Sequence, residues 1–323
     1  MAPPRNVVVV GASAGGVEAL SAFVAELAPG LTAAVLVVLH VAPGGTSVLP
    51  GILDRSGPLP AHAARDGEPL EQGKVLVAVP DHHLIVDGED VRLARGPREN
   101  GHRPAVDPLF RSAAASFGAH VVGIVLSGTR DDGTAGAAAI KAAGGRVLVQ
   151  DPEDALYASM PASVLEAVGA DGQGSAGRLG RIVSTWVGQR NGAAVMSATG
   201  GDLPVDPGRH EAGEYGSIGL TCPECGGAVY LDSYEGVAQF NCHTGHAFSP
   251  ESFAAEQEHA LEGALWSAVR HLKERAGLLR RLADRIQPTG PIAGGHFHAA
   301  AREADEQADI IRGLIGSRSP EPS

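Results

Sequence analysis

Residues 6–20, NVVVVGASAGGVEAL, decide which class of fold this sequence predicts. The valines predict a buried strand and the glycine-rich segment a tight turn. Apolar residues then recur at the spacing of a helix: Val17, Leu20, Val24 and Leu27. A strand–turn–helix unit of this kind either cradles a phosphate at the helix N-terminus or presents a nucleophilic serine there. The role of Ser13 therefore separates two classes of function, nucleotide binding and hydrolysis.

The alternation of strand and helix patterns continues to about residue 186. Runs rich in valine and leucine predict further strands at 33–39, 74–79, 121–127 and 146–150, and the helices between them include 107–117 and 134–144. Because these strands are apolar along their whole length, we expect them to be parallel and buried on both faces. Residues 83–94 predict an added hairpin that turns at Asp87-Gly88. The fold class is therefore α/β, with a doubly wound, mostly parallel sheet in a Rossmann-like three-layer arrangement.

Composition limits the classes of function. The formal net charge of −12 argues against nucleic-acid binding, which needs a basic face. No apolar run approaches the ~18 residues of a membrane span, so we expect no direct membrane insertion. The N-terminus, MAPPRN, leads straight into a strand without a secretory apolar segment, which favours a cytoplasmic protein. The sequence gives no indication of the oligomeric state.

Changes in composition predict four parts of the chain. Residues 1–187 form the α/β domain, and residues 188–217, rich in glycine, alanine, proline and charge, read as a linker. Residues 218–250 contain all three cysteines and short strand patterns. Residues 251–323 contain a long helix pattern, a break at QPTGPIAGG and a shorter helix, which predicts a helical hairpin.

Two departures argue against a dinucleotide-binding turn. Ser13 stands where the second glycine of G-x-G-x-x-G would let the backbone approach a pyrophosphate. The next strand ends in His40, where a ribose-binding acidic residue is expected. Both departures favour a nucleophilic Ser13, although nucleotide binding remains an alternative.

A serine nucleophile needs a base, and the base needs an orienting acid. In a doubly wound sheet such groups gather beyond the carboxyl ends of the strands. His40 follows one strand, and Asp132 lies in a glycine-bounded turn after another. Other candidates by position are the loop histidines His62, His82 and His102 and the acids Asp131 and Asp151. Backbone N–H groups of Ala14 or Gly15, and others from the turn at 128–130, are candidate oxyanion donors.

Four segments resemble one family in order and spacing. They are VVVVGASAGGVEAL, VVLHVAPG, RPAVDPLF and IVLSGTRDDGTAG, spread over roughly residues 5–170. Together they resemble the catalytic domain of the CheB-type chemotaxis protein-glutamate methylesterases. The resemblance implies hydrolysis of glutamate γ-methyl esters on chemoreceptors to glutamate and methanol, and for many members deamidation of glutamine, without a catalytic cofactor. It maps the catalytic triad onto Ser13, His40 and Asp132, because Asp132 directly precedes the glycine.

The sequence also departs from the family pattern. Ala14 replaces a frequent threonine, and Thr129, Arg130 and Asp131 replace Met-Gly-Asn. The methionine position is thought to donate a backbone N–H to the oxyanion, which Thr129 would supply here. In NGHRPAVD, His102 and Arg103 are candidate substrate contacts, with anchoring of the loop as the alternative for Arg103. The family's receiver domain has no room before residue 6, so control by phosphorylation in cis is not expected.

The cysteines suggest a metal site. Cys222 and Cys225 have C-x-x-C spacing, and Cys242 is followed by His246 four residues later. Two short loops that each offer two ligands are typical of a structural zinc site of zinc-ribbon type. His246 is a better fourth ligand than His243, because the Gly245 turn lets its side chain point inward. Reduced thiols without a metal are the alternative. Residues 218–250 contain no lysine or arginine, which disfavours nucleic acid as the partner of this segment.

Three other functions remain open beside the methylesterase, whose partner would be a methylated chemoreceptor or a similar signalling protein. One is a different Ser-His-Asp esterase or amidase with a non-receptor substrate. Another is a non-catalytic signalling adaptor that binds through the cysteine segment. The third is the nucleotide binder described above.

Overall fold

The computed structural model describes residues 6–42, 44, 47–190, 218–286 and 291–317. The chain divides into two compact units, Met1–Phe253 and Ala254–Ser323. The first unit contains both the α/β domain and the cysteine segment. From residue 191 onward, the linker predicted at 188–217 lies outside the described residues.

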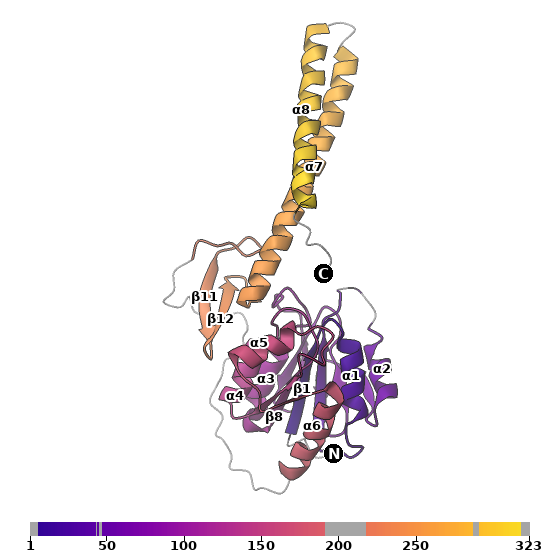
Figure 1. Ribbon diagram of the computed structural model, residues 1–323, viewed down its shortest axis with the longest axis vertical. Coiled ribbons are helices and arrows are strands. Elements are labelled where there is room, and N and C mark those ends of the chain that lie inside the picture. Colours follow the sequence, from indigo (N-terminus) through magenta and orange to yellow (C-terminus); the bar gives the residue numbers. More distant parts are fainter. Residues whose placement is uncertain (1–5, 43, 45–46, 191–217, 287–290, 318–323) are drawn as a thin grey trace. The chain divides into compact units, whose positions relative to one another are not determined.

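The first unit is built on a seven-stranded sheet, shown in Figure 1, in which every neighbouring pair is parallel. The strand order is β10-β9-β8-β1-β2-β5-β3. The strands are β1 (Asn6–Ala12), β2 (Ala33–Leu39), β3 (Ala61–Ala63), β5 (Val75–Val77), β8 (Val121–Val125), β9 (Arg146–Gln150) and β10 (Gly172–Gly174). The doubly wound α/β fold is thus confirmed, with all five predicted strands of the large sheet present. His62 was expected in a loop, and this was wrong, because it lies in β3.

Helices cover both faces of this sheet, so its central strands β1, β2 and β8 are buried along their whole length (Figure 1). One face is covered by α1 (Gly16–Ala25), α2 (Leu49–Ser56) and α6 (Ala176–Arg190). The other is covered by α3 (Val106–Phe117), α4 (Thr134–Ala142) and α5 (Ser159–Ala167), and a 3₁₀ turn, η1 (Gly118–His120), follows α3. Along β1, Val8 and Val10 pack into the first layer, and Val7 and Val9 pack into the second.

A small antiparallel sheet of order β4-β7-β6 adds to the second layer. Its strands are β4 (Glu68–Pro69), β6 (His83–Asp87) and β7 (Asp90–Ala94). The predicted hairpin at 83–94 is therefore confirmed. Asp87 pairs with Asp90, so the turn consists of Gly88 and Glu89, one residue later than expected. Gly88 has a φ of +61°, which glycine adopts without steric cost.

The strand order reverses at β1, because β2 and β8 lie on opposite sides of it. The carboxyl ends of these three strands therefore border the crevice where doubly wound folds place their functional groups. The turn after β1 is tight. Gly15 has a φ of +68°, and a Cβ there would lie 2.8 Å from both Ser127 Oγ and Leu156 Cβ. Only glycine allows α1 to begin so close to the neighbouring loops.

The cysteine segment forms a three-stranded antiparallel sheet of β11 (Val229–Tyr234), β12 (Val237–Cys242) and β13 (Ala247–Phe248). The next element is α7 (Pro250–Ile286), and α8 (Pro291–Gly316) follows it. In the second unit, α7 and α8 pack through an apolar cluster that includes Val269, Ala308 and Ile315. Within the described residues, no helix combines the length and apolar character needed to cross a membrane.

Candidate active site and metal cluster

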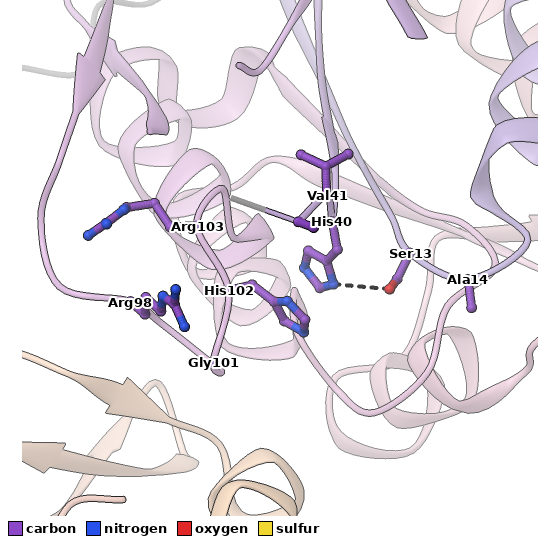
Figure 2. A pocket seen from close by; sticks show the side chains of 9 residues that line it. Ser13, Ala14, His40, Val41, Arg98, Gly101, His102 and Arg103 are labelled. Carbon is purple, nitrogen blue, oxygen red and sulfur yellow. Dashed lines mark hydrogen bonds between the residues drawn. The ribbon is translucent and has the colours of Figure 1, made fainter. Parts of the chain in front are cut away.

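Ser13, His40 and Asp132 come together at the carboxyl edge of the large sheet. Ser13 follows β1, His40 follows β2, and Asp132 lies in the turn between β8 and α4. His40 Nδ1 lies 3.1 Å from Ser13 Oγ, the contact drawn in Figure 2, and His40 Nε2 lies 2.7 Å from Asp132 Oδ2. An ionised Asp132 accepts from Nε2–H, so it selects the tautomer whose Nδ1 is free to take the serine proton.

The carboxylate of Asp132 is held by four donors and is fully buried. Oδ2 accepts from His40 Nε2 and from the backbone N–H of Val106 at 2.7 Å, and Oδ1 accepts from Asn100 Nδ2 at 2.9 Å and from the N–H of Asp107 at 3.2 Å. Burial alone would raise the pKa of Asp132. The His40 contact, with the Val106 and Asn100 donors, outweighs burial and holds that pKa below its usual range. The carboxylate is therefore ionised while it orients His40.

Asn100 and Asp107 complete this network, and neither was among the site residues predicted from the sequence. Asn100 Nδ2 also donates to Asp107 Oδ2 at 3.0 Å, and Asp107 Oδ1 accepts from the N–H of Gly136 at 2.7 Å. Burial and the nearby charge of Asp132 raise the pKa of Asp107 well above its usual value. The neutral form of Asp107 is favoured, so negative charge is concentrated on Asp132. In sequence, the pair Asn100-Gly101 is typical of a turn, so it does not indicate that Asn100 binds Asp132 and Asp107.

His102 stacks on the ring of His40. The two ring centroids lie 3.8 Å apart with an interplanar angle of 14°, an arrangement visible in Figure 2. Burial, followed by the repulsion of a charged His40, lowers the pKa of His102 to about 3. His102 is therefore neutral near neutral pH, and it packs against the His40 imidazole without placing a positive charge beside that ring.

A cavity of about 420 Å³ opens beside Ser13 and His40. Of the predicted substrate and oxyanion residues, Ala14, His102 and Arg103 line it, whereas Gly15 and Thr129 do not. The Arg103 guanidinium points away from Ser13 in Figure 2. Its Nε donates to Asp81 Oδ1 at 3.0 Å and its Nη1 to the carbonyl of Gly96 at 2.6 Å. This geometry favours loop anchoring over substrate contact for Arg103.

The peptide group between Ala14 and Gly15 is fixed by Ser127. Ser127 Oγ donates to the carbonyl of Ala14 at 2.8 Å, and the N–H of a trans peptide points away from its carbonyl. The N–H of Gly15 is thereby directed away from Ser127. Within the described part of the chain, the N–H groups of Ala14 and Gly15 have no hydrogen-bond partner. They are free donors at the positive end of α1.

The three cysteines and His246 form a second cluster. Their four ligand atoms all lie within 4.8 Å of one another. Cys225 Sγ lies 3.8 Å from Cys242 Sγ, and His246 Nδ1 lies 3.5 Å from Cys242 Sγ and 3.7 Å from Cys222 Sγ. Two sulfurs bound tetrahedrally to one Zn²⁺ at about 2.3 Å lie about 3.8 Å apart. The cluster can therefore hold a metal ion of this size.

His243, the alternative ligand, does not belong to this cluster of four. Its ring lies over Gly227, where a Cβ would come within 2.1 Å of Cε1. His243 Nε2 lies 3.5 Å from Thr244 Oγ1. The neighbouring histidine on the same loop is thus outside the metal cluster, which makes it a natural control for His246.

Comparisons with known proteins show which family the α/β domain resembles. A family model described as CheB methylesterase matches residues 8–183. Proteins described as protein-glutamate methylesterase/protein-glutamine glutaminase are similar to this chain. One from Methanosarcina acetivorans is 38% identical over 178 residues, covering 53% of this chain and 50% of that protein. One from Anaeromyxobacter dehalogenans is 43% identical over 171 residues, covering 52% and 50%.

A solved structure agrees with these matches. The crystal structure of the Thermotoga maritima CheB methylesterase catalytic domain aligns with a TM-score of 0.54 at 32% identity, covering 56% of this chain and 98% of that one. The chain spans about half the length of the curated relatives it matches. The family match ends at residue 183, before the Cys/His cluster begins.

Proposed function

The chain belongs to the CheB methylesterase family, and from this premise we propose that it hydrolyses glutamate γ-methyl esters in a methylated chemoreceptor or a similar signalling protein. The products are glutamate and methanol. The same site would convert glutamine to glutamate with release of ammonia. The observation that carries this proposal is the hydrogen-bonded row of Ser13, His40 and Asp132 inside the matched domain.

In the first half of the proposed reaction, Ser13 Oγ attacks the ester carbonyl carbon and His40 Nδ1 takes the hydroxyl proton. Asp132 stabilises the imidazolium through Nε2–H. The negative charge that develops on the carbonyl oxygen is stabilised by the free N–H groups of Ala14 and Gly15. When the tetrahedral intermediate collapses, His40 Nδ1 returns the proton to the departing oxygen. Methanol leaves, and the glutamyl group is esterified to Ser13.

In the second half, water attacks this acyl-enzyme while His40 Nδ1 accepts one of its protons. Collapse of the second tetrahedral intermediate breaks the bond to Ser13 Oγ, and His40 returns the proton to that oxygen. Glutamate leaves, and the free enzyme is restored. The sum is one ester plus one water giving one acid and one methanol, without any redox change.

A methanol-release assay on the full chain tests the proposed function. Receptor carrying methylated glutamates should release methanol in the presence of the protein, and p-nitrophenyl acetate serves as a generic ester. Hydrolysis of the generic ester without any release of methanol from receptor would assign the protein to a different class of serine esterase. No serine-dependent hydrolysis of either substrate would assign it a non-catalytic role.

We propose that Cys222, Cys225, Cys242 and His246 bind one structural zinc ion. The ion would cross-link two loops and takes no part in the ester chemistry. The purified chain should contain about one zinc per molecule by elemental analysis, and His246→Ala should lose most of it. His243→Ala is the matched control and should keep its zinc. Equal zinc loss in both variants, or no zinc in the unmodified protein after growth in zinc, would contradict this assignment.

A further inference from the structure

The metal-binding segment is hydrogen-bonded to the loop that supports Asp132. Strand β13 begins one residue after His246 and pairs with β12 along one edge. Along its other side, the N–H of Asn100 donates to the carbonyl of Ala247 at 2.8 Å, and the N–H of Ser249 donates to Asn100 Oδ1, also at 2.8 Å. The chain leaving the metal cluster is therefore held between its own sheet and the Asn100 loop.

A second contact involves the residue next to Asp132. Asp131 is only 8% exposed, and its Oδ1 accepts hydrogen bonds from the hydroxyls of Ser249 and Ser252. Ser252 Oγ lies 2.8 Å from that oxygen. Because a buried carboxylate is costly unless it is hydrogen-bonded, these hydroxyls fix the Asp131–Asp132 turn.

The hydrogen bonds of Asn100 show why these contacts matter for Asp132. Both Nδ2 hydrogens are used, one on Asp132 Oδ1 and one on Asp107 Oδ2, and Oδ1 accepts the N–H of Ser249. A flipped amide would aim its oxygen at two carboxyl groups and its NH₂ at an N–H donor. The Ser249 N–H therefore helps to fix which way the amide faces, and so which atoms reach Asp132.

The part of the chain that supplies Ser249 has only a small apolar core of its own. Its apolar core consists of Cys222, Val229, Cys242, Phe248 and Phe253, with Phe240 packed against it. Segments below about 40 residues usually need a metal, disulfides or a partner to fold. Two of the five core residues, Cys222 and Cys242, are themselves members of the Cys/His cluster. Metal binding is thus expected to be coupled to the order of β13 and Ser249.

We propose that residues 218–253, which we term the clasp, form a metal-dependent positioning element for the Asp132 carboxylate. Metal bound at the Cys/His cluster orders β13, and β13 holds Asn100 and Asp131 in place. Asn100 is a positioning residue that acts on His40 through Asp132. The docking of the clasp stands independently, and its catalytic consequence rests on the proposed methylesterase function.

Hydrogen exchange on the full chain tests the docking without any measurement of activity. Zinc-loaded and chelator-treated protein are compared by mass spectrometry. Loss of metal should speed exchange in the clasp and also in residues 98–107 and 128–133, whereas residues 146–187 should not change. Faster exchange confined to the clasp would overturn the proposal.

Serine variants test the catalytic consequence without disturbing the metal ligands. Ser249→Ala with Ser252→Ala should lower kcat for methanol release about tenfold, because Asp131 loses two donors, with KM little changed. The matched control is Ser233→Ala, an exposed position in β11, which should behave as the unmodified chain. Equal kcat in the double variant and the control would overturn the catalytic part of the proposal.

Asn100→Asp tests the positioning role through the pH dependence of kcat/KM, which should not change if Asn100 only stabilises the fold. It keeps the side-chain shape but replaces two donors with an acceptor beside Asp107 and Asp132. An added negative charge in this network favours the protonated form of the catalytic base, so the acidic limb of the kcat/KM profile should move up by about one pH unit. Besides Asp107 and Asp132, the charged and titratable groups near this position include Glu99, which is paired with Arg111, and the stacked rings of His40 and His102. An unchanged acidic limb would contradict the positioning role. If the unmodified chain releases no methanol, the proposed function fails, and hydrogen exchange still decides whether the clasp is coupled to this loop.

Discussion

Replacing Ser13 with alanine should lower kcat for methanol release by a factor of about 10⁴–10⁶. The variant loses the protein atom proposed to attack the substrate carbonyl carbon, and His40 has no serine proton left to accept. The fold should be retained, because Ser13 is only partly buried and its backbone N–H still donates to the carbonyl of Ser127. Steady-state methanol release, with circular dichroism as the check on folding, measures the effect.

Ser21→Ala is the matched control for this substitution. The Ser21 hydroxyl lies in α1 and donates to the carbonyl of Val17, away from His40 and Asp132. Its loss should leave kcat within about twofold. A fluorophosphonate probe should label the unmodified chain and Ser21→Ala but leave Ser13→Ala unlabelled. Methanol release by Ser13→Ala at more than a tenth of the unmodified rate would show that Ser13 is not the nucleophile.

Local patterns of apolar residues were enough to predict the main strands of the α/β domain. Strands β2 and β9 have the predicted bounds, because each is a continuous apolar run between polar or glycine-rich ends. Three-residue strands such as β3 and β10 carry no such run, so their pairing depends on the neighbouring strand rather than on their own sequence. The placement of Ser13, His40 and Asp132 at one edge followed from a general property of parallel sheets, whose carboxyl ends lie together.

The hydrogen-bond partners around Asp132 could not be predicted from local sequence patterns. Asn100 and Ser249 are 149 residues apart, and neither carries a motif that indicates its partner. Asp131 and Asp132 are adjacent and chemically identical, yet Asp132 accepts from His40 whereas Asp131 accepts from two serines of the clasp. The roles of such neighbours depend on which way each side chain faces after folding. Arg103 illustrates the same point, because its guanidinium is bound to Asp81 and Gly96 and points away from Ser13.

Replacing Asp132 with asparagine should lower kcat about 10⁴-fold with little change in side-chain volume. Both oxygens of Asp132 face N–H donors, His40 and Val106 at one and Asn100 and Asp107 at the other. Either orientation of the new amide therefore aims its NH₂ at a donor. With the NH₂ toward His40, Nε2 becomes the acceptor, and the ring proton moves to Nδ1, where it blocks acceptance of the serine proton. With the oxygen toward His40, the imidazolium loses the negative charge that stabilises it.

Asp151→Asn is the control for Asp132→Asn, because it also removes a carboxylate that follows a strand of the large sheet. Asp151 follows β9 as Asp132 follows β8, but its carboxylate accepts from the N–H of Glu153 in its own turn. The control should therefore keep kcat within about twofold.

The carboxylate of Asp132 also stabilises the fold. Because its folded-state pKa is depressed, that contribution is present above the ordinary aspartate pKa and is lost as the pH falls through the folded-state value. Asp132→Asn should thus unfold at a lower temperature at pH 7, and the difference should narrow in acid. If Asp132→Asn instead kept a kcat equal to that of Asp151→Asn, the buried carboxylate would serve stability alone, and His40 would need no partner to act as the base.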